Sequence, residues 1–255
     1  MTLYVPNIKI SIDGLVNRMS KKDPFGLSKL NILQDIISNL LNLFPYTLEH
    51  NSGKYMAIRK AHYLACIDGI EGDYLEFGVF TGSSFTHSMR AYAKTKRYDT
   101  RKRQVSFYGF DSFEGFGEVE EKYAHKFFQD SNFKWPYQKV VDRVNKLSKK
   151  LKLDAKIKKG FFKDTLDNPT NYGIEKASII FLDSDLYTAT LESLNFCTSL
   201  IQNGTIILID EFFYFKGMKE NTPYGAFIEW CKKNSFEFRV ITHYGIGSAI
   251  VSMSK

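Results

Sequence analysis

Short apolar runs that alternate with helical segments constrain the fold of this chain more than any other feature of its sequence. Residues 177–182 and 205–209 are each about the length of a buried strand, and both are almost entirely apolar. Strands that alternate with helices are joined by right-handed crossovers and pair into a mostly parallel sheet covered on both faces. The sequence therefore predicts an α/β sandwich of three layers.

The expected elements follow one another between residues 28 and 251. Two helices come first, over 28–44 and 55–67. The expected strands are 73–79, 105–110, 155–160, 177–182, 205–209, 237–242 and 248–251, and the later helices are 83–94, 137–151, 186–200 and 224–233. The last two strands are separated only by a turn with Gly245 and Gly247, which favours an antiparallel pair at the end of the sheet. Seven strands with a reversed terminal one resemble the Rossmann-like class I methyltransferase architecture.

The N-terminal part has a different character. Prolines and glycines interrupt residues 1–27, which we interpret as an arm or lid. We therefore expect residues 1–50 to form an N-terminal arm or helical lid. Residues 51–255 would form the single globular unit.

Composition excludes several classes of protein. With 44% hydrophobic residues, including 22 Phe and 15 Tyr, the chain cannot remain mainly disordered. Its apolar runs are too short for a membrane span, and its N-terminus lacks the pattern of a secretory signal. Three widely separated cysteines, Cys66, Cys197 and Cys231, suggest reduced thiols and a cytoplasmic location.

The net charge of +7 is concentrated in two basic segments, residues 94–103 and 146–159. A solvated surface is the simplest interpretation. Attraction to an anionic substrate or to nucleic acid is the alternative. Neither segment interleaves its charges with aromatic residues as an RNA-stacking surface would, so nucleic acid is the less favoured partner.

A glycine-containing turn follows the first strand of the expected sheet, in the run YLEFGVFTGSS. Gly78 and Gly82 bracket the turn, and Ser83 begins the next helix. Glycine lets the backbone approach a ligand closely, and a helix start presents free N–H groups. The carboxylate of Glu76 would suit a cationic amino group. The three-glycine dinucleotide pattern is missing, with Phe80 at its middle position, so an ordinary strand–helix turn remains an alternative.

An acid follows the second strand as well. Asp111 ends the apolar part of the run FYGFDSFEGF. A carboxylate at this edge can accept hydrogen bonds from both hydroxyls of a ribose. Because Asp also favours turns, a purely structural role is the alternative.

Four acids at the ends of two strands are the strongest feature. Asp183 and Asp185 follow one strong strand, and Asp210 and Glu211 follow the next. If these strands are neighbours, the acids meet at one edge, where unpaired carboxylates repel one another. Oxygen ligands of this kind predict Mg²⁺ or a similar cation with open positions for substrate hydroxyls. Helix capping would explain one acid at a strand end but not two at each.

The chain resembles a known family, the macrocin O-methyltransferase (TylF-type) family. Its members are sugar O-methyltransferases that depend on S-adenosylmethionine (SAM) and Mg²⁺. Five runs carry the resemblance, in the family's order and over about residues 50–251: GDYLEFGVFTG, GFDSFEG, GFFKDTL, LDSDLY and IDEF. Together these runs are specific. Singly, only DSDLY and GFDSFEG would be.

The resemblance implies a role for each matching position. The residues near the cofactor would be Glu76, Gly78, Thr81, Gly82 and Ser83 at the methionine part, Asp111, Ser112 and Phe113 at the ribose, and Gly160, Phe161 and Asp164 at the adenine, with Asp183 beside them. The Mg²⁺ ligands would be Asp183, Asp210 and Glu211. The family usually shows two consecutive aspartates where this chain has Asp210 and Glu211, so one ligand is a methylene longer.

The implied reaction moves a methyl group from a sulfonium to a hydroxyl of high pKa. A metal that coordinates the hydroxyl stabilises the alkoxide-like transition state, and a base accepts the proton. Asp185 is the expected catalytic base if its carboxylate faces the site, and His243 or a metal-bound water is the alternative. The aromatic run 212–215 lines the acceptor pocket or belongs to the core.

Three other functions are alternatives to methylation of a sugar. A small phenol or catechol could use the same metal edge, an RNA-binding protein or RNA methyltransferase could use the basic segments, and a degenerate relative could bind SAM without metal. A sugar predicts a deep polar pocket under residues 1–60, whereas a catechol predicts a flat aromatic slot. The expected partners are a small-molecule or saccharide acceptor and further copies of the chain, in a homodimer or higher oligomer.

Overall fold

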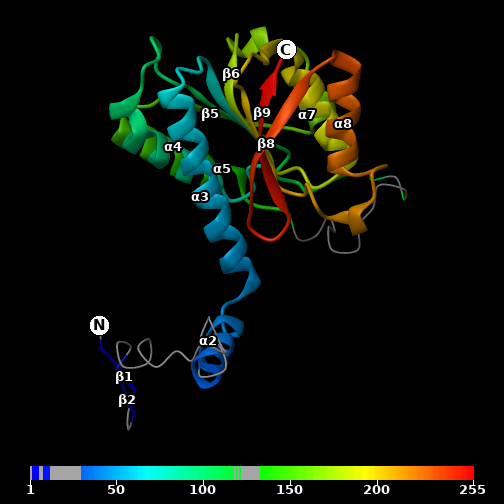
Figure 1. Ribbon diagram of the computed structural model, residues 1–255. Helices are drawn as coiled ribbons and strands as arrows, with labels where there is room; N and C mark the ends of the chain where they lie inside the picture. Colours follow the sequence, from blue (N-terminus) through cyan, green and yellow to red (C-terminus); the bar gives the residue numbers. More distant parts are fainter. Residues whose placement is uncertain (1, 6–7, 12–29, 118, 120, 122–132) are drawn as a thin grey trace. The chain divides into compact units, whose positions relative to one another are not determined.

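The computed structural model describes residues 2–5, 8–11, 30–117, 119, 121 and 133–255 (Figure 1). The chain divides into two compact units, Met1–Leu48 and Glu49–Lys255. In the first unit, strands β1 (Thr2–Val5) and β2 (Ile8–Ser11) form an antiparallel pair. Helix α2 (Asn31–Asn42) confirms the predicted helix 28–44 with shorter ends. Residues 12–29 of the predicted arm lie outside the described residues, and the lid and the boundary after residue 50 remain predictions.

The second unit contains a seven-stranded sheet and its helices. The strands are β3 (Asp73–Phe77), β4 (Phe107–Asp111), β5 (Ala155–Lys159), β6 (Ala177–Leu182), β7 (Ile206–Ile209), β8 (Glu237–Tyr244) and β9 (Ser248–Ser254). The α-helices are α3 (Tyr46–Ile67), which begins just before this unit, α4 (Ser83–Thr95), α5 (Tyr137–Leu151), α6 (Phe162–Thr165), α7 (Tyr187–Cys197) and α8 (Pro223–Asn234). Short 3₁₀ helices are η2 (Lys96–Tyr98), η5 (Pro169–Tyr172), η6 (Thr198–Leu200) and η7 (Phe215–Gly217).

The strand order is β5-β4-β3-β6-β7-β9-β8. Every pair is parallel except the two that involve β9, which runs antiparallel to both β7 and β8. The predicted α/β fold with a mostly parallel sheet and a reversed terminal strand is therefore confirmed. The order changes direction between β3 and β6, and in such sheets ligands bind beyond the carboxyl ends of the strands at this point.

Helices cover both faces of the sheet (Figure 1). One core cluster joins α3, α4 and α5 to strand residues such as Tyr74 and Phe107. The other joins α7 and α8 to residues such as Phe77 and Phe110. Successive side chains of a strand point to opposite faces of the sheet, so each strand contributes to both clusters. All three cysteines are buried free thiols, as predicted. Within the described part of the chain, no helix has both the length and the apolar character that crossing a membrane requires.

Helix α3 begins at Tyr46, so the predicted start at Tyr55 is wrong. Glycine lowers helix propensity, and Gly53 argues against a helix when only local sequence is considered. Tertiary packing reverses this preference. A Cβ at Gly53 would lie 2.4 Å from the backbone nitrogen of Gly245 in the β8–β9 turn, so the glycine allows the turn to pack closely against the helix. The extra turns of α3 carry His50 and Lys54.

Candidate active site

A cavity of about 590 Å³ opens at the carboxyl ends of β3, β4 and β6. Its volume falls in the range of roughly 300–1,000 Å³ that is usual for small-molecule sites. The turns that follow β3, β4, β5 and β6 line it together with Lys54 of α3. The predicted cofactor residues that line it are Gly78, Asp111, Ser112, Phe161 and Asp183.

Gly78 is the residue at which the backbone leaves β3. It has a φ of +89°, and a Cβ at this position would lie 1.8 Å from the carbonyl oxygen of Asp183. Both the backbone angle and the lack of space require glycine. The turn after β3 and the turn after β6 therefore meet at Gly78, on the floor of the cavity.

The carboxylate of Asp111 is hydrogen-bonded to backbone N–H groups. Its Oδ2 accepts from the nitrogens of Val79 and Phe80, each at 2.7 Å, and its Oδ1 accepts from the nitrogen of Phe113 at 2.6 Å. Burial raises the pKa of Asp111, and these N–H groups oppose the shift. Three of about four acceptor positions on the carboxylate are thus occupied. Asp111 joins the turns after β3 and β4, and its contact with a ribose remains a prediction.

Glu76 lies behind the turn after β3. It is fully buried, the Tyr74 hydroxyl donates to its Oε2, and Ser84 Oγ donates to its Oε1 at 2.6 Å. Burial raises the pKa of Glu76 to about 8, although the hydrogen bonds from Ser84 and Tyr74 oppose the shift. Close by, Nε2 of the buried His62 lies 2.7 Å from Ser88 Oγ. We refer to Tyr74, Glu76, Ser84, His62 and Ser88 as the inner network.

Seven of the predicted cofactor residues do not line the cavity in this structure. Among them, Ser83 begins α4, and Arg143 donates to the Thr81 carbonyl at 3.1 Å. Phe113 is buried in the core. Their roles remain predictions, and the seven are Glu76, Thr81, Gly82, Ser83, Phe113, Gly160 and Asp164.

The four predicted acids meet at the ends of the neighbouring strands β6 and β7. Asp183, Asp185 and Glu211 each offer a carboxylate oxygen, and these oxygens lie within 4.8 Å of one another. Asp185 has a φ of +63° and lines the cavity. Helix α7 has Leu186 as its N-cap residue and no side-chain capping bond, so the capping alternative for the two aspartates is wrong.

Two bases from α3 contact this acid cluster. Lys54 Nζ lies 2.8 Å from Oδ2 of Asp183 and 2.8 Å from Oδ2 of Asp210. His50 Nε2 lies 3.1 Å from Oδ2 of Asp210. The nitrogen of Ile246 donates to His50 Nδ1 at 3.4 Å, so Nε2 carries the proton that is shared with Asp210.

From the sequence, His50 was expected to be a surface or packed residue, and Lys54 was not expected in the site. They stand four residues apart, which places them on one face of a helix. This signal was lost when the helix was expected to begin at Tyr55. Extending the helix to Pro45 would have shown two bases one turn apart, before a strand edge rich in acids.

The pKa values of the four acids shift in different directions: those of Asp183, Asp185 and Glu211 are raised, and that of Asp210 is lowered. Burial raises the pKa of Asp183 to about 7, and the charge of Asp210 adds to the shift. Burial and the neighbouring acids raise the pKa of Asp185 and of Glu211 well above the usual range. Burial alone would raise the pKa of Asp210 too, but Lys54 and His50 lower it. Burial opposes the charge on Lys54, yet its two carboxylate partners raise its pKa.

The donor set of the acid cluster fits a divalent cation. If ionised, the four acids carry four negative charges against the one positive charge of Lys54. Burial raises the pKa values of Asp183, Asp185 and Glu211, and repulsion among the acids adds to the shift. Carboxylate oxygens are also the ligands that Mg²⁺ prefers. Asp183 and Glu211 belong to both the predicted ligand set and the trio of close oxygens. Asp210 instead contacts Lys54, His50 and Ser248 Oγ, the last at 3.1 Å, so its role as a ligand remains a prediction.

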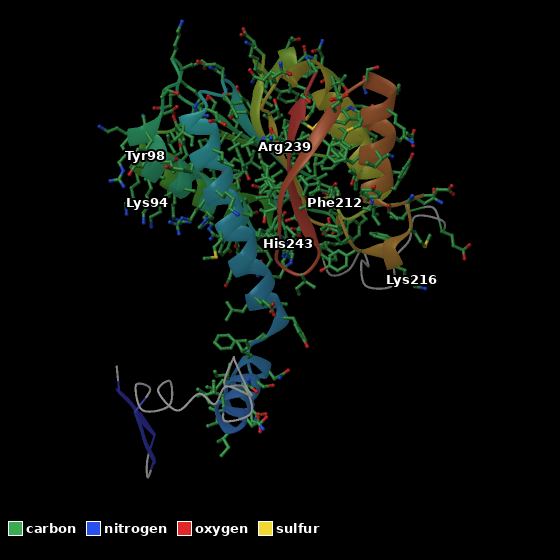
Figure 2. All side chains as sticks on the ribbon, in the orientation of Figure 1. Lys94, Tyr98, Phe212, Lys216, Arg239 and His243 are labelled. Carbon is green, nitrogen blue, oxygen red and sulfur yellow. The ribbon has the colours of Figure 1, made fainter. Side chains whose placement is uncertain are left out.

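Two further residues considered in the sequence are labelled in Figure 2. His243 is exposed on β8, and the adjacent Tyr244 is buried, so the two side chains point to opposite faces of the strand. His243 does not line the cavity. Phe212 is buried and packs against Tyr224, with ring centroids 5.0 Å apart, which supports the core interpretation for this residue, whereas Phe213 is 56% exposed.

Comparison with known proteins gives a consistent result. A sequence model of the family described as Macrocin-O-methyltransferase (TylF) matches residues 52–224, more than half of the chain. The chain is 29% identical over 154 residues to mycinamicin III 3''-O-methyltransferase of Micromonospora griseorubida, covering 57% of each protein. It is 31% identical over 156 residues to 8-demethyl-8-(2,3-dimethoxy-alpha-L-rhamnosyl)-tetracenomycin-C 4'-O-methyltransferase of Streptomyces olivaceus, covering 57% of this chain and 54% of that protein. The chain thus matches little more than half the length of these relatives.

Solved structures share the fold. The O-methyltransferase NovP superimposes with a TM-score of 0.62 at 22% sequence identity, over 80% of each chain. The calicheamicin methyltransferase CalS11 superimposes with a TM-score of 0.61 at 17% identity, over 93% of this chain and 96% of that one. At these identities the likeness establishes the architecture of the sheet and its helices.

Proposed function

The chain belongs to the macrocin O-methyltransferase (TylF) family, and on this premise we propose that it transfers a methyl group from SAM to a sugar hydroxyl, in a glycan precursor or a glycosylated natural product. The names of the two relatives support a glycosylated acceptor. One acts on mycinamicin III, and the other on a tetracenomycin that carries a rhamnosyl group.

One observation carries the proposal. A single cavity is bounded on one side by the Gly78 turn and on the other by Asp183 and Asp185 of the acid cluster. The first side allows a ligand to approach the backbone closely. The second side offers carboxylate oxygens that can coordinate a cation or accept a hydrogen bond from a hydroxyl. Methyl transfer to a hydroxyl needs these two features next to each other, because donor and acceptor must be held in line.

The cavity suits SAM, which supplies a methyl group already activated by the sulfonium charge. The backbone at Gly78 lines the cavity where the methionine part would lie, and Phe161 offers an aromatic surface for the adenine. Asp111 holds the turns that frame both regions through its three backbone hydrogen bonds. In this proposal Asp111 shapes the cofactor site, whether or not it also touches the ribose.

Mg²⁺ dependence is a second part of the proposal. Asp183 and Glu211 would hold the cation, and the third carboxylate ligand would be Asp210 or Asp185. A bound cation would make the acceptor hydroxyl more acidic. Asp185 is the base that we propose, because it lines the cavity and therefore can reach an acceptor there. Lys54 would keep Asp183 and Asp210 in place.

Thermal unfolding tests the cofactor and the cation separately. Each ligand that binds only the folded state raises the midpoint by mass action. We expect S-adenosylhomocysteine to raise the midpoint. With this cofactor bound, the midpoint should be higher in Mg²⁺ than in EDTA. Glu211→Gln should keep the first shift and lose the second. Glu237→Gln, an exposed acid on β8, is the matched control and should keep both.

The outcomes separate the parts of the proposal. A cofactor shift without any response to Mg²⁺ contradicts the metal part alone. No response to the cofactor contradicts the methyltransferase itself. Asp185→Asn and Asp210→Asn then identify the third ligand, because only the ligand variant should lose the Mg²⁺ shift.

The acceptor is tested with SAM labelled in its methyl group. We expect label in deoxysugar glycosides. A catechol is the second candidate, because Phe80, Phe116 and Phe133 give one wall of the cavity an aromatic surface. Label in the catechol and not in the glycosides would favour this second candidate, and label in total RNA would contradict both.

A further inference from the structure

The two basic segments of the sequence, 94–103 and 146–159, meet in the folded unit. Gln104 connects them. Its Oε1 accepts from Lys96 Nζ at 2.5 Å, and its Nε2 donates to the carbonyl oxygen of Lys152 at 3.0 Å. Helices α4 and α5, which lead into these segments, also pack against each other. The surface that results is separate from the cavity, because none of its basic residues lines it.

We define the basic face by six exposed residues: Lys94, Arg97, Lys146, Lys149, Lys150 and Lys152. None of the six has a carboxylate within salt-bridge distance among the described residues. Helix α4 and η2 contain no acid, and α5 contains only Asp142, which Gln138 contacts at 2.8 Å. The positive charge of the face is therefore not compensated by its own helices.

Two acids near the face are already paired with other groups. Asp99 binds the buried Arg101 at 2.7 Å, and Asp73 binds Arg103 at 2.6 Å. Arg101 and Arg103 thus neutralise these two acids, and the six residues of the basic face have no carboxylate partner among the described residues. Outward charge without local compensation suits an anionic partner.

Exposed aromatic side chains adjoin these charges. Tyr98 is 46% exposed, and Figure 2 shows it near Lys94. The Arg97 guanidinium lies 4.7 Å from the Tyr98 ring centre, and the Tyr63 ring meets the same ring edge-on at 5.8 Å. Tyrosines beside lysines and arginines are typical of proteins that bind at the headgroup level of a membrane. Base stacking is less favoured, because Arg97 and Tyr63 already contact the Tyr98 ring.

We propose that the basic face docks the protein on an anionic lipid surface. The long lysine and arginine side chains would reach the headgroups, and Tyr98 and Tyr63 would lie at their level. Association would be peripheral and reversible, because it depends on charges within about a Debye length of the lipid surface. The proposal does not depend on methyl transfer or on its acceptor.

Cosedimentation of the full chain with lipid vesicles tests the proposal. The probes are vesicles of phosphatidylcholine alone and vesicles with equal parts of phosphatidylcholine and phosphatidylglycerol. We expect binding only to the second kind, and its loss in 0.5 M salt. Each basic residue near such a surface contributes about fivefold to binding (about 1 kcal/mol), so Lys149→Glu with Lys150→Glu should weaken it by about 25-fold or more.

Helix α8 offers a matched control. Lys232 and Lys233 are adjacent, exposed and in the last turn of α8, as Lys149 and Lys150 are in the last turn of α5. Lys232→Glu with Lys233→Glu makes the same change in net charge and should leave binding within about twofold.

Three outcomes overturn the proposal. The first is no binding to the anionic vesicles at low salt. The second is an equal loss in both double variants, which would mean that net charge alone decides. The third is binding to single-stranded RNA, competed by salt, without binding to vesicles, which would assign the face to nucleic acid.

Discussion

Helix α3 carries two buried bases whose pKa values shift in opposite directions. Burial opposes the charge on Lys54, but its carboxylate partners raise its pKa above the ordinary value. Eight residues later, burial is the main cause that lowers the pKa of His62 to about 3. Lys54 contacts two carboxylates, whereas His62 contacts the neutral hydroxyl of Ser88 and aromatic rings. One helix thus joins a charged cluster at one end and the uncharged His62 site at the other.

The difference teaches which buried polar groups serve a ligand. The acid cluster borders the cavity, and burial together with mutual repulsion raises the pKa values of Asp183 and Asp185. The inner network is closed off, and Glu76 has a hydrogen bond on each carboxylate oxygen. A crowded charge cluster lowers stability, so its persistence beside a cavity indicates a binding or catalytic site.

The largest effect is expected for Lys54→Met. Removing one partner of a buried ion pair leaves the other charge uncompensated, which costs about 3–5 kcal/mol. We expect a loss of this size in the free energy of unfolding in EDTA, measured by urea denaturation at pH 7. Mg²⁺ should restore part of the loss, because it supplies positive charge to the same acids. Lys60→Met, at an exposed position of α3, should change stability by less than about 0.5 kcal/mol.

The second prediction concerns pH and His62. The folded pKa of about 3 lies below the unfolded value of about 6.5, so the unfolded chain binds a proton first as pH falls. The stability that His62 contributes is complete above pH 6.5 and declines toward pH 3. At pH 5 the loss is about 2 kcal/mol, from 1.5 units at 1.36 kcal/mol each. His62→Gln should remove this part of the pH dependence, and the exposed His243→Gln should not. Equal slopes in all three proteins would contradict a neutral buried His62.

The third prediction reverses the sign. Asp185→Asn removes a buried carboxyl whose pKa is raised by burial and by the neighbouring acids, so folding no longer has to neutralise it. We therefore expect the protein in EDTA to gain about 1 kcal/mol in stability. The same variant should lose methyl transfer if Asp185 is the base. A destabilisation of similar size would instead mean that the Asp185 carboxyl holds the cluster together.

An effect of about the same size but opposite sign is expected for Ser84→Ala in the inner network. One oxygen of the buried Glu76 then lacks its hydrogen bond, which costs about 1–1.5 kcal/mol. Urea unfolding at pH 7 measures the change, with Ser52→Ala at an exposed position of α3 as the control. No loss would show that water replaces the serine, and that the network is not closed.

Much of the fold could be read from local sequence. The strand β6 is almost entirely apolar, and the strands alternate with helices, so the class of the sheet followed from periodicity and length. The four acids were also correctly expected at one edge, because β6 and β7 are neighbours. The end of β3 was correctly expected to contain a tight turn, since Gly78 has a φ that other residues rarely adopt.

The parts that were missed depend on contacts between distant residues. Helix α3 runs through Gly53, which packs closely against Gly245, almost two hundred residues later. The bonding of Asp111 to the nitrogens of Val79 and Phe80 likewise depends on how two turns are placed side by side. Local propensity contains no information on either contact.

The sequence by itself determined which chemical groups are present and at which strand ends they stand, because strand and helix periodicity are local properties. Only the tertiary structure decided how those groups are partnered. It placed Lys54 between Asp183 and Asp210, and it joined two basic segments into one face through Gln104. Pairing of this kind is decided by distances across the fold, and the charge that each buried group keeps follows from the partner it meets.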